Sequence, residues 1–232
     1  MKFNINKKDL LKHITIAQKA ISSKSTMQIL EGILFDISNN ELTLISTDLE
    51  LSVETKLDAD ISEEGAIVIN SNIIGNIVRK LPDDIIYFTV KDSNVNIRCQ
   101  NSEFNIQGHD ASSYPALPDI EKSSSINIDN EELKQAIKET EFAASNDETR
   151  LALTGLLLEK EKDSINLVGL DGYRLAVKKI DSKNEEADEV IVPRRAFLEL
   201  SRILEQGSTD IRIVRGHIVF ENERTKLYSR LI

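Results

Sequence analysis

The sequence predicts an α+β protein of two repeated domains, each with two helices packed on mostly antiparallel sheets. Three observations predict this. The chain matches itself at a constant offset of 123 residues, and each half carries two amphipathic helical stripes. The other apolar residues mostly alternate with polar ones, as they do in half-buried strands. With 232 residues, 40% of them hydrophobic, the chain is long enough to form two packed domains of common size.

The internal repeat appears when the stretch that starts at Phe3 is set against the one that starts at Ile126. The offset pairs apolar residues and also polar ones and glycines: Leu10 with Leu133, Ile14 with Ile137, Ser22 with Ser145, Thr26 with Thr149, Gly32 with Gly155, and Asp48 with Asp171. Chance matching of apolar residues does not explain the paired glycines, aspartates and threonines. We therefore expect domains at 1–120 and 121–232. The stretch 108–125 joins them, since it holds two of the four prolines and a serine cluster.

Each element of the first repeat follows from a local pattern. A short strand at 3–5 precedes a helix at 9–21 that puts Leu10, Ile14, Ala17 and Ile21 on one stripe. A second helix is expected to be N-capped by Ser71 and to end before Pro82. Strands are predicted at 30–37, 41–47, 49–57, 66–70, 85–90, 94–99 and 103–107, with a turn at Asn39–Asn40. The second repeat should have the same order.

Positive charge is concentrated on the predicted helices although the chain has a net charge of −10. Residues 7–24 alone contain five lysines and one aspartate. On a helical wheel, most of the helical cations lie away from the apolar stripes. For any one helix a solvated outer face is the simpler interpretation. Several such helices in an acidic chain favour a basic surface that contacts DNA phosphates without reading bases. The predicted DNA-binding residues are Lys8, Lys12, Lys19, Lys24, Arg79, Lys138, Arg195 and Arg202.

The stretch GLDGYRLAV, residues 169–177, predicts a β-hairpin because an Asp-Gly pair lies between apolar runs. Tyr173 and Arg174 leave this turn, whereas the matching stretch of the first repeat, 46–51, keeps the aspartate but has no glycine, tyrosine or arginine. The difference favours a role specific to the second domain. From the residues alone, the alternative is a tyrosine lying along the surface and an arginine paired with a local carboxylate.

Catalytic motifs are absent from the sequence. It has no P-loop and no HExxH, and His13, His109 and His217 lack the spacing of metal ligands. Asp48 and Asp171 could be imagined as an acid/base pair, but turn-capping aspartates are commoner. The single Cys99 suits a reducing compartment, and neither a signal peptide nor a membrane span is visible, so we expect a cytoplasmic protein without cofactor or metal. The competing classes are a hydrolase or nuclease with a basic cleft and a scaffold that binds only peptides.

Six stretches carry a family resemblance: MKFNINKKDLL, STMQIL, STDLEL, LALTGLLLE, GLDGYRLAV and VIVPRRAFLEL. In register along essentially the whole chain, they resemble the bacterial β sliding clamps, the processivity subunits of DNA polymerase III. The resemblance implies a DNA-clamp fold with three domains per chain. It also implies that two chains close head to tail into a homodimeric ring around duplex DNA. Twelve helices would face the hole, the sheets would form the outer wall, and the protein would not be an enzyme.

The resemblance also implies a hydrophobic pocket for a short peptide motif of polymerase III, the clamp loader and other partners. The pocket residues would be Leu153, Leu170, Gly172, Tyr173, Arg174 and Leu175. The chain departs from the family in three ways. It stops where the second repeat ends, so a third domain is expected to be absent. Helix 131–142 is acidic, and Tyr173 stands where many clamps have a histidine.

Overall fold

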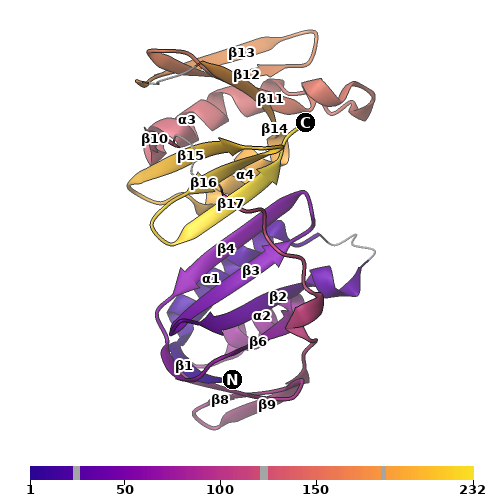
Figure 1. Cartoon of the computed structure of the whole chain (residues 1–232), viewed down its shortest axis with the longest axis vertical. Helices are drawn as coiled ribbons and strands as arrows, with labels where there is room; N and C mark the ends of the chain where they lie inside the picture. The colour runs from indigo at the N-terminus through magenta and orange to yellow at the C-terminus, as the bar shows by residue number, and fades with distance from the viewer. Residues whose placement is uncertain (23–26, 121–124, 184–186) are drawn as a thin grey trace. The chain divides into compact units, whose positions relative to one another are not determined.

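The computed structural model describes residues 1–22, 27–120, 125–183 and 187–232 (Figure 1). The chain divides into two compact units, Met1–Leu117 and Pro118–Ile232. Each unit contains two α-helices and antiparallel strands, as predicted. Within the described residues, no helix is both long enough and apolar enough to cross a membrane.

Unit 1 begins with a strand that leads directly into the first helix. Its elements are β1 (Lys2–Asn6), α1 (Lys7–Ala17), β2 (Gly32–Ser38), β3 (Glu41–Thr47), β4 (Leu51–Leu57), β5 (Asp60–Glu63), β6 (Gly65–Asn70), α2 (Ser71–Lys80), β7 (Ile85–Lys91), β8 (Asn94–Cys99) and β9 (Ser102–Gln107). One antiparallel sheet has the order β5-β1-β7-β8-β9, and a second run has the order β4-β3-β2-β6.

Unit 2 has the same order apart from β5, whose equivalent positions, 183–186, fall mostly outside the described residues. Its elements are β10 (Ser125–Asp129), α3 (Asn130–Thr140), β11 (Gly155–Lys160), β12 (Ser164–Leu170), β13 (Leu175–Asp181), β14 (Asp188–Pro193), α4 (Arg194–Ile203), β15 (Ser208–Val214), β16 (His217–Glu221) and β17 (Thr225–Arg230). Two 3₁₀ turns, η4 (Glu141–Ala143) and η5 (Glu148–Leu153), follow α3. The strands form the runs β13-β12-β11-β14 and β10-β15-β16-β17.

The predicted duplication is confirmed at the level of single residues. Helices α3 and α4 begin and end 123 residues after α1 and α2, and the same holds for β12 relative to β3. The strand register agrees too, because the last pair of β3 and β4, Thr47 with Ser52, becomes Leu170 with Leu175 in β12 and β13. Asn6 and Asp129 cap α1 and α3 through their side-chain oxygens.

The paired glycines have the same cause in both units. A Cβ on Gly32 would lie 2.4 Å from a Val68 methyl group, and one on Gly155 would lie 2.7 Å from an Ile191 methyl group. Val68 and Ile191 are themselves 123 residues apart. Each glycine therefore allows β2 or β11 to start close against its neighbouring strand.

In unit 1 the core lies between the helices and the sheets. The apolar stripe of α1 is fully buried, and α1 packs on β3 and β4. In Figure 1, α1 lies behind β3 and β4, and α2 lies behind β2 and β6. Phe3 and Phe88 stack with ring centroids 4.7 Å apart. In unit 2, Phe197 of α4 meets Phe220 of β16 edge to face at 5.6 Å. The first contact joins strands β1 and β7, and the second holds α4 on the strands of unit 2.

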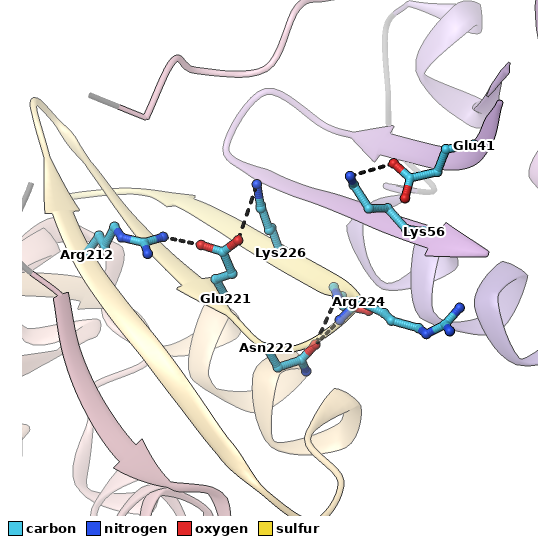
Figure 2. Close-up of polar contacts among 8 residues, drawn as sticks. Glu41, Lys56, Arg212, Glu221, Asn222, Arg224 and Lys226 are labelled. Carbon is cyan, nitrogen blue, oxygen red and sulfur yellow. Dashed lines mark hydrogen bonds and ion pairs between the residues drawn. The ribbon is translucent and has the colours of Figure 1, made fainter. Parts of the chain in front are cut away.

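Cross-strand ion pairs lie on the strands of both units. In unit 1, Lys56 of β4 contacts Glu41 of β3 at 2.6 Å. In unit 2, Glu221 of β16 lies between Arg212 of β15 and Lys226 of β17 (Figure 2). Arg212 and Lys226 hold the pKa of Glu221 below its usual value against the opposing effect of burial. Several strand cations are therefore already matched by carboxylates of the same unit.

Four local predictions need correction. The N-cap of α2 is Asn70, not Ser71, because the Asn70 side chain accepts hydrogen bonds from the backbone N–H groups of Asn72 and Ile73. Helix α1 ends at Ala17, and the next residues of the predicted helix, Gln18–Ala20, form a 3₁₀ turn. Strand β4 starts at Leu51 rather than at 49, and the short strand β5 was not predicted.

The predicted joint is also only partly a linker. Within it, residues 108–117 belong to unit 1. His109 bridges Val68 through the backbone, and the buried Tyr114 hydroxyl donates to the carbonyl of Gly32 at 3.0 Å. Proline and serine content alone did not show that this stretch is anchored in the fold.

Candidate functional site

In the hairpin of β12 and β13, the residues Asp171–Arg174 follow the last strand pair, Leu170 with Leu175, and the Asp171 N–H donates to the Arg174 carbonyl at 3.3 Å. The Asp171 side chain organises this loop. One carboxylate oxygen accepts from the backbone N–H groups of Tyr173 and Arg174 at 2.9 and 3.0 Å, and the other accepts from the Arg174 Nε at 2.9 Å. These hydrogen bonds, led by the one from Tyr173, hold the pKa of Asp171 below its ordinary value.

Asp48 organises the equivalent turn of unit 1 in the same way. It accepts from the N–H groups of Glu50 and Leu51 at 3.1 and 2.8 Å. The two aspartates therefore serve as turn caps, the commoner of the two roles weighed from the sequence.

The loop presents its apolar side chains to solvent. Tyr173 is 96% exposed and Leu175 is 62% exposed, and Leu170 is also exposed. Aromatic and leucine side chains that gather on one turn, with an arginine between them, are typical of a surface that binds a partner. The structure thus brings together five of the six predicted pocket residues: Leu170, Gly172, Tyr173, Arg174 and Leu175.

The sixth predicted residue, Leu153, lies on η5, and its carbonyl accepts from the backbone N–H of Ser145. The side chain that η5 places beside the hairpin is Arg150, since a Cβ on Gly172 would lie 3.4 Å from the Arg150 Nη1. A further neighbour is Phe142 on η4, whose ring lies below Arg174. The sequence analysis did not identify Arg150 or Phe142. Their counterparts in the first repeat are Met27 and Lys19, and this difference between the repeats was the signal that could have found them.

A groove of about 380 Å³ lies elsewhere in unit 2, between α3 and β13. It is lined by Glu131, Glu132, Gln135, Lys178, Lys179, Ile180 and Asp181, and by none of the predicted pocket residues. Its lining is mostly charged, unlike the leucine-rich surface that was predicted.

Three of the predicted DNA-binding cations of unit 1, Lys8, Lys12 and Arg79, lie on the neighbouring helices α1 and α2. Helices α1 and α2 approach closely where the Gln18 side chain donates to the Ser71 carbonyl at 2.8 Å. Lys12 is exposed, and Arg79 is exposed with its guanidinium on the Asn76 side chain. Lys8 contacts Asp83 at 2.7 Å, and this hydrogen bond raises the pKa of Lys8. Lys19 lies half-buried in the 3₁₀ turn after α1, and Lys24 falls outside the described residues.

In unit 2, Lys138 of α3 and Arg195 and Arg202 of α4 are exposed, and Arg202 contacts Glu199 one turn earlier. The acidic character of α3 and η4 is offset locally, because three of their carboxylates form ion pairs. The pairs are Glu131 with Lys134, Glu139 with Lys178, and Glu141 with Arg194. In the part of the chain that the structure describes, no group of three or more His, Cys, Asp or Glu side chains is placed to hold a metal ion.

Comparisons with known proteins agree with this geometry. The model of the DNA polymerase III beta subunit, N-terminal domain, matches residues 1–118, and the model of the central domain of the same subunit matches residues 127–232. The beta sliding clamp of Bacillus subtilis is 34% identical over 245 residues, which cover 100% of this chain and 65% of that protein. The chain thus spans about 65% of the length of the curated relatives it matches.

Solved structures agree as well. A DNA polymerase III beta subunit from Eubacterium rectale superimposes with a TM-score of 0.96 at 37% identity, over 100% of this chain and 65% of that one. A sliding clamp from Pseudomonas aeruginosa bound to griselimycin gives 0.94 at 27% identity, over 100% and 64%. With both units matched by domains of one subunit, the chain belongs to the family of bacterial DNA polymerase III beta subunits, the β sliding clamps.

Proposed function

We propose that the chain forms part of a DNA sliding clamp, a non-catalytic processivity factor that encircles duplex DNA without reading its sequence. In this proposal, chains of three such domains close as a homodimeric ring. The clamp tethers the replicative polymerase, the clamp loader and other partners through short peptide motifs. The observation that carries the proposal is the repeated pair of helices with solvent-facing cations, in a chain whose named relatives are sliding clamps.

The charge distribution supports DNA contact despite the net charge of −10. Lys12 and Arg79 lie on adjacent helices of unit 1, and Lys138 and Arg195 lie on the equivalent helices of unit 2. Lysine and arginine on exposed helical faces suit phosphate contacts, which are sequence-independent and sensitive to salt.

The β12–β13 hairpin supports peptide binding. It offers a rigid loop, exposed leucines and a tyrosine that is almost entirely in solvent. Burying one leucine side chain of a partner peptide contributes about 1.5–3 kcal/mol. Arg174 would hydrogen-bond to the peptide backbone, and Gly172 would permit close approach.

The DNA part is tested by the affinity of the 232-residue chain for a short fluorescent duplex, measured by anisotropy at about 50 and about 200 mM salt. We expect weak binding that decreases steeply with salt. The double variant Lys12→Glu/Arg79→Glu should bind more weakly and reduce the slope of log K against log salt by about 2. The matched control, Lys91→Glu/Lys162→Glu, changes the net charge by the same amount on exposed lysines outside the helices, and it should behave as wild type.

Equal losses in both double variants would mean that net charge alone governs the interaction, and the assignment of the helical faces would then be wrong. No measurable duplex affinity at low salt, together with intact peptide binding, would favour the competing function of a peptide-binding scaffold without DNA.

The peptide part is tested by isothermal titration with griselimycin, which occurs bound to the Pseudomonas aeruginosa clamp. A synthetic peptide with the clamp-binding motif of a bacterial polymerase is the second probe. Arg174→Ala/Leu153→Ala should abolish binding of the motif peptide while leaving the unfolding transition in place. Unchanged affinity of this variant for both probes would overturn the pocket assignment.

A further inference from the structure

Phe142 is a half-exposed aromatic residue of unit 2. It lies in the middle of η4, between the helix end and Ala143, which is fully buried. Ala143 anchors this turn, whereas the Phe142 side chain remains 47% exposed. A single half-exposed phenylalanine needs no special explanation, and what distinguishes Phe142 is the cation that lies over its ring.

The ring of Phe142 lies under the guanidinium of Arg174, whose Cζ is 5.6 Å from the ring centroid. This distance is within the range of cation–π attraction. On its other side, Arg174 donates through Nε to the Asp171 carboxylate at 2.9 Å. The guanidinium therefore contacts both an aromatic face and a carboxylate, which is itself fixed by two backbone N–H groups.

This arrangement orders the guanidinium without using up its donors. An arginine has five N–H groups, and the bond to Asp171 involves Nε. The Arg174 side chain is still 58% exposed. An arginine with these two contacts has less rotamer freedom to lose when a partner binds, which lowers the entropic cost of binding.

The first repeat shows that the pair is not required by the turn. The equivalents of Phe142 and Arg174 are Lys19 and Leu51. Leu51 is buried, and yet the turn around Asp48 has the same hydrogen bonds as the turn around Asp171. Both members of the aromatic–cation pair are thus present in unit 2 and absent from unit 1, while the backbone geometry is shared.

From these observations we propose that Phe142 is a positioning residue, which orients Arg174 for the backbone of a bound peptide. The inference rests on the peptide-binding function proposed above. The Phe142 ring acts by orienting Arg174 and not by contacting the ligand. Loss of the aromatic face should then weaken binding only when Arg174 is present.

A double-mutant cycle tests this with griselimycin and the motif peptide as probes, titrated calorimetrically against the full 232-residue chain. Phe142→Leu retains apolar volume but removes the π face, and we expect it to weaken binding about two- to fivefold. In an Arg174→Ala background the same change should have no effect. Phe142→Trp should restore wild-type affinity, since tryptophan is the best aromatic partner of a cation. Tyr87→Leu, at a tyrosine of unit 1 that is 53% exposed, is the matched control and should bind as wild type.

The outcomes separate this inference from the function beneath it. If Arg174→Ala weakens binding but Phe142→Leu does not, the hairpin function stands and the positioning role is wrong. Equal losses from Phe142→Leu with and without Arg174 would show that the ring contacts the ligand directly, which also overturns the proposal. If neither probe binds wild type, or if Arg174→Ala binds as wild type, the proposed peptide site is itself wrong and the inference falls with it. Thermal unfolding of each variant controls for loss of fold.

Discussion

Leu49 and Gly172 occupy the same position in two equivalent turns, 123 residues apart, and both have positive φ angles, 77° and 93°. The aspartate before each of them caps its turn with the same pair of backbone hydrogen bonds. The left-handed conformation is therefore a property of the duplicated turn, whether leucine or glycine occupies the position. In unit 1 a leucine adopts it at a cost that unit 2 avoids.

Replacing Leu49 with glycine should stabilise unit 1. A left-handed conformation costs an L-residue about 1–2 kcal/mol. Glycine loses about 0.5–1 kcal/mol through its greater freedom in the unfolded chain. The net gain should be about 0.5 kcal/mol, visible as a higher urea midpoint. The reciprocal variant Gly172→Ala should destabilise unit 2 by a similar amount, about 0.5 kcal/mol. A lower midpoint for Leu49→Gly would contradict the strain argument.

Asp171→Asn should alter how stability depends on pH. The folded-state pKa of Asp171 is lowered from its ordinary value of 3.8, so its ionised form stabilises the fold above that pH. This contribution is lost as the pH falls through the lowered pKa. Wild type should therefore be more stable than the variant at neutral pH, and the difference should shrink below pH 3.8. Urea unfolding of both proteins at several pH values measures it, and a difference that does not change with pH would refute the assignment.

The sequence predicted the fold wherever the residues in question are local or repeated. The offset of 123 located both helices of unit 2 and the hairpin at Asp171, because patterning and turn chemistry depend on neighbouring residues. Prediction failed where the outcome depends on side-chain geometry or on packing between distant parts of the chain. Whether Asn70 or Ser71 caps α2 depends on which side chain reaches the helix N–H groups. The contact of Phe142 with Arg174 depends on how closely η4 packs on β12. The order of residues in one sequence does not show such packing.

Tyr114→Phe should destabilise unit 1, although Tyr114 lies in the stretch predicted as a joint. Its hydroxyl is buried and donates to the Gly32 carbonyl at 3.0 Å. Losing one such hydrogen bond costs about 1 kcal/mol. Burial also raises the pKa of Tyr114 above its ordinary value of 10.0. As the pH rises above 10.0, the tyrosine of the unfolded chain therefore ionises first, and wild type loses stability. The phenylalanine variant should lack this alkaline decrease. Denaturant midpoints at neutral and alkaline pH would show both effects, and equal midpoints at neutral pH would contradict the hydrogen-bond argument.

Gly169→Ala should destabilise unit 2 and disturb the hairpin site. A Cβ on Gly169 would lie 2.3 Å from the Thr140 carbonyl oxygen and 3.2 Å from the Cβ of Ala143. In unit 1 the equivalent residue is Ser46, whose hydroxyl donates to the Ala17 carbonyl at 2.6 Å. In unit 2, Gly169 has no such hydroxyl, and the end of α3 packs directly on β12.

An added methyl group at Gly169 must therefore displace η4, at a cost of about 1–3 kcal/mol. Because Phe142 lies on η4, the same displacement should move the ring from beneath Arg174 and weaken binding of the motif peptide. Gly216→Asn is the matched control: its φ of 75° suits asparagine, and a Cβ there meets no atom within 4 Å. This control should retain both stability and affinity. If Gly169→Ala bound the peptide as tightly as the control does, the packing of η4 on β12 would not be what orders Arg174.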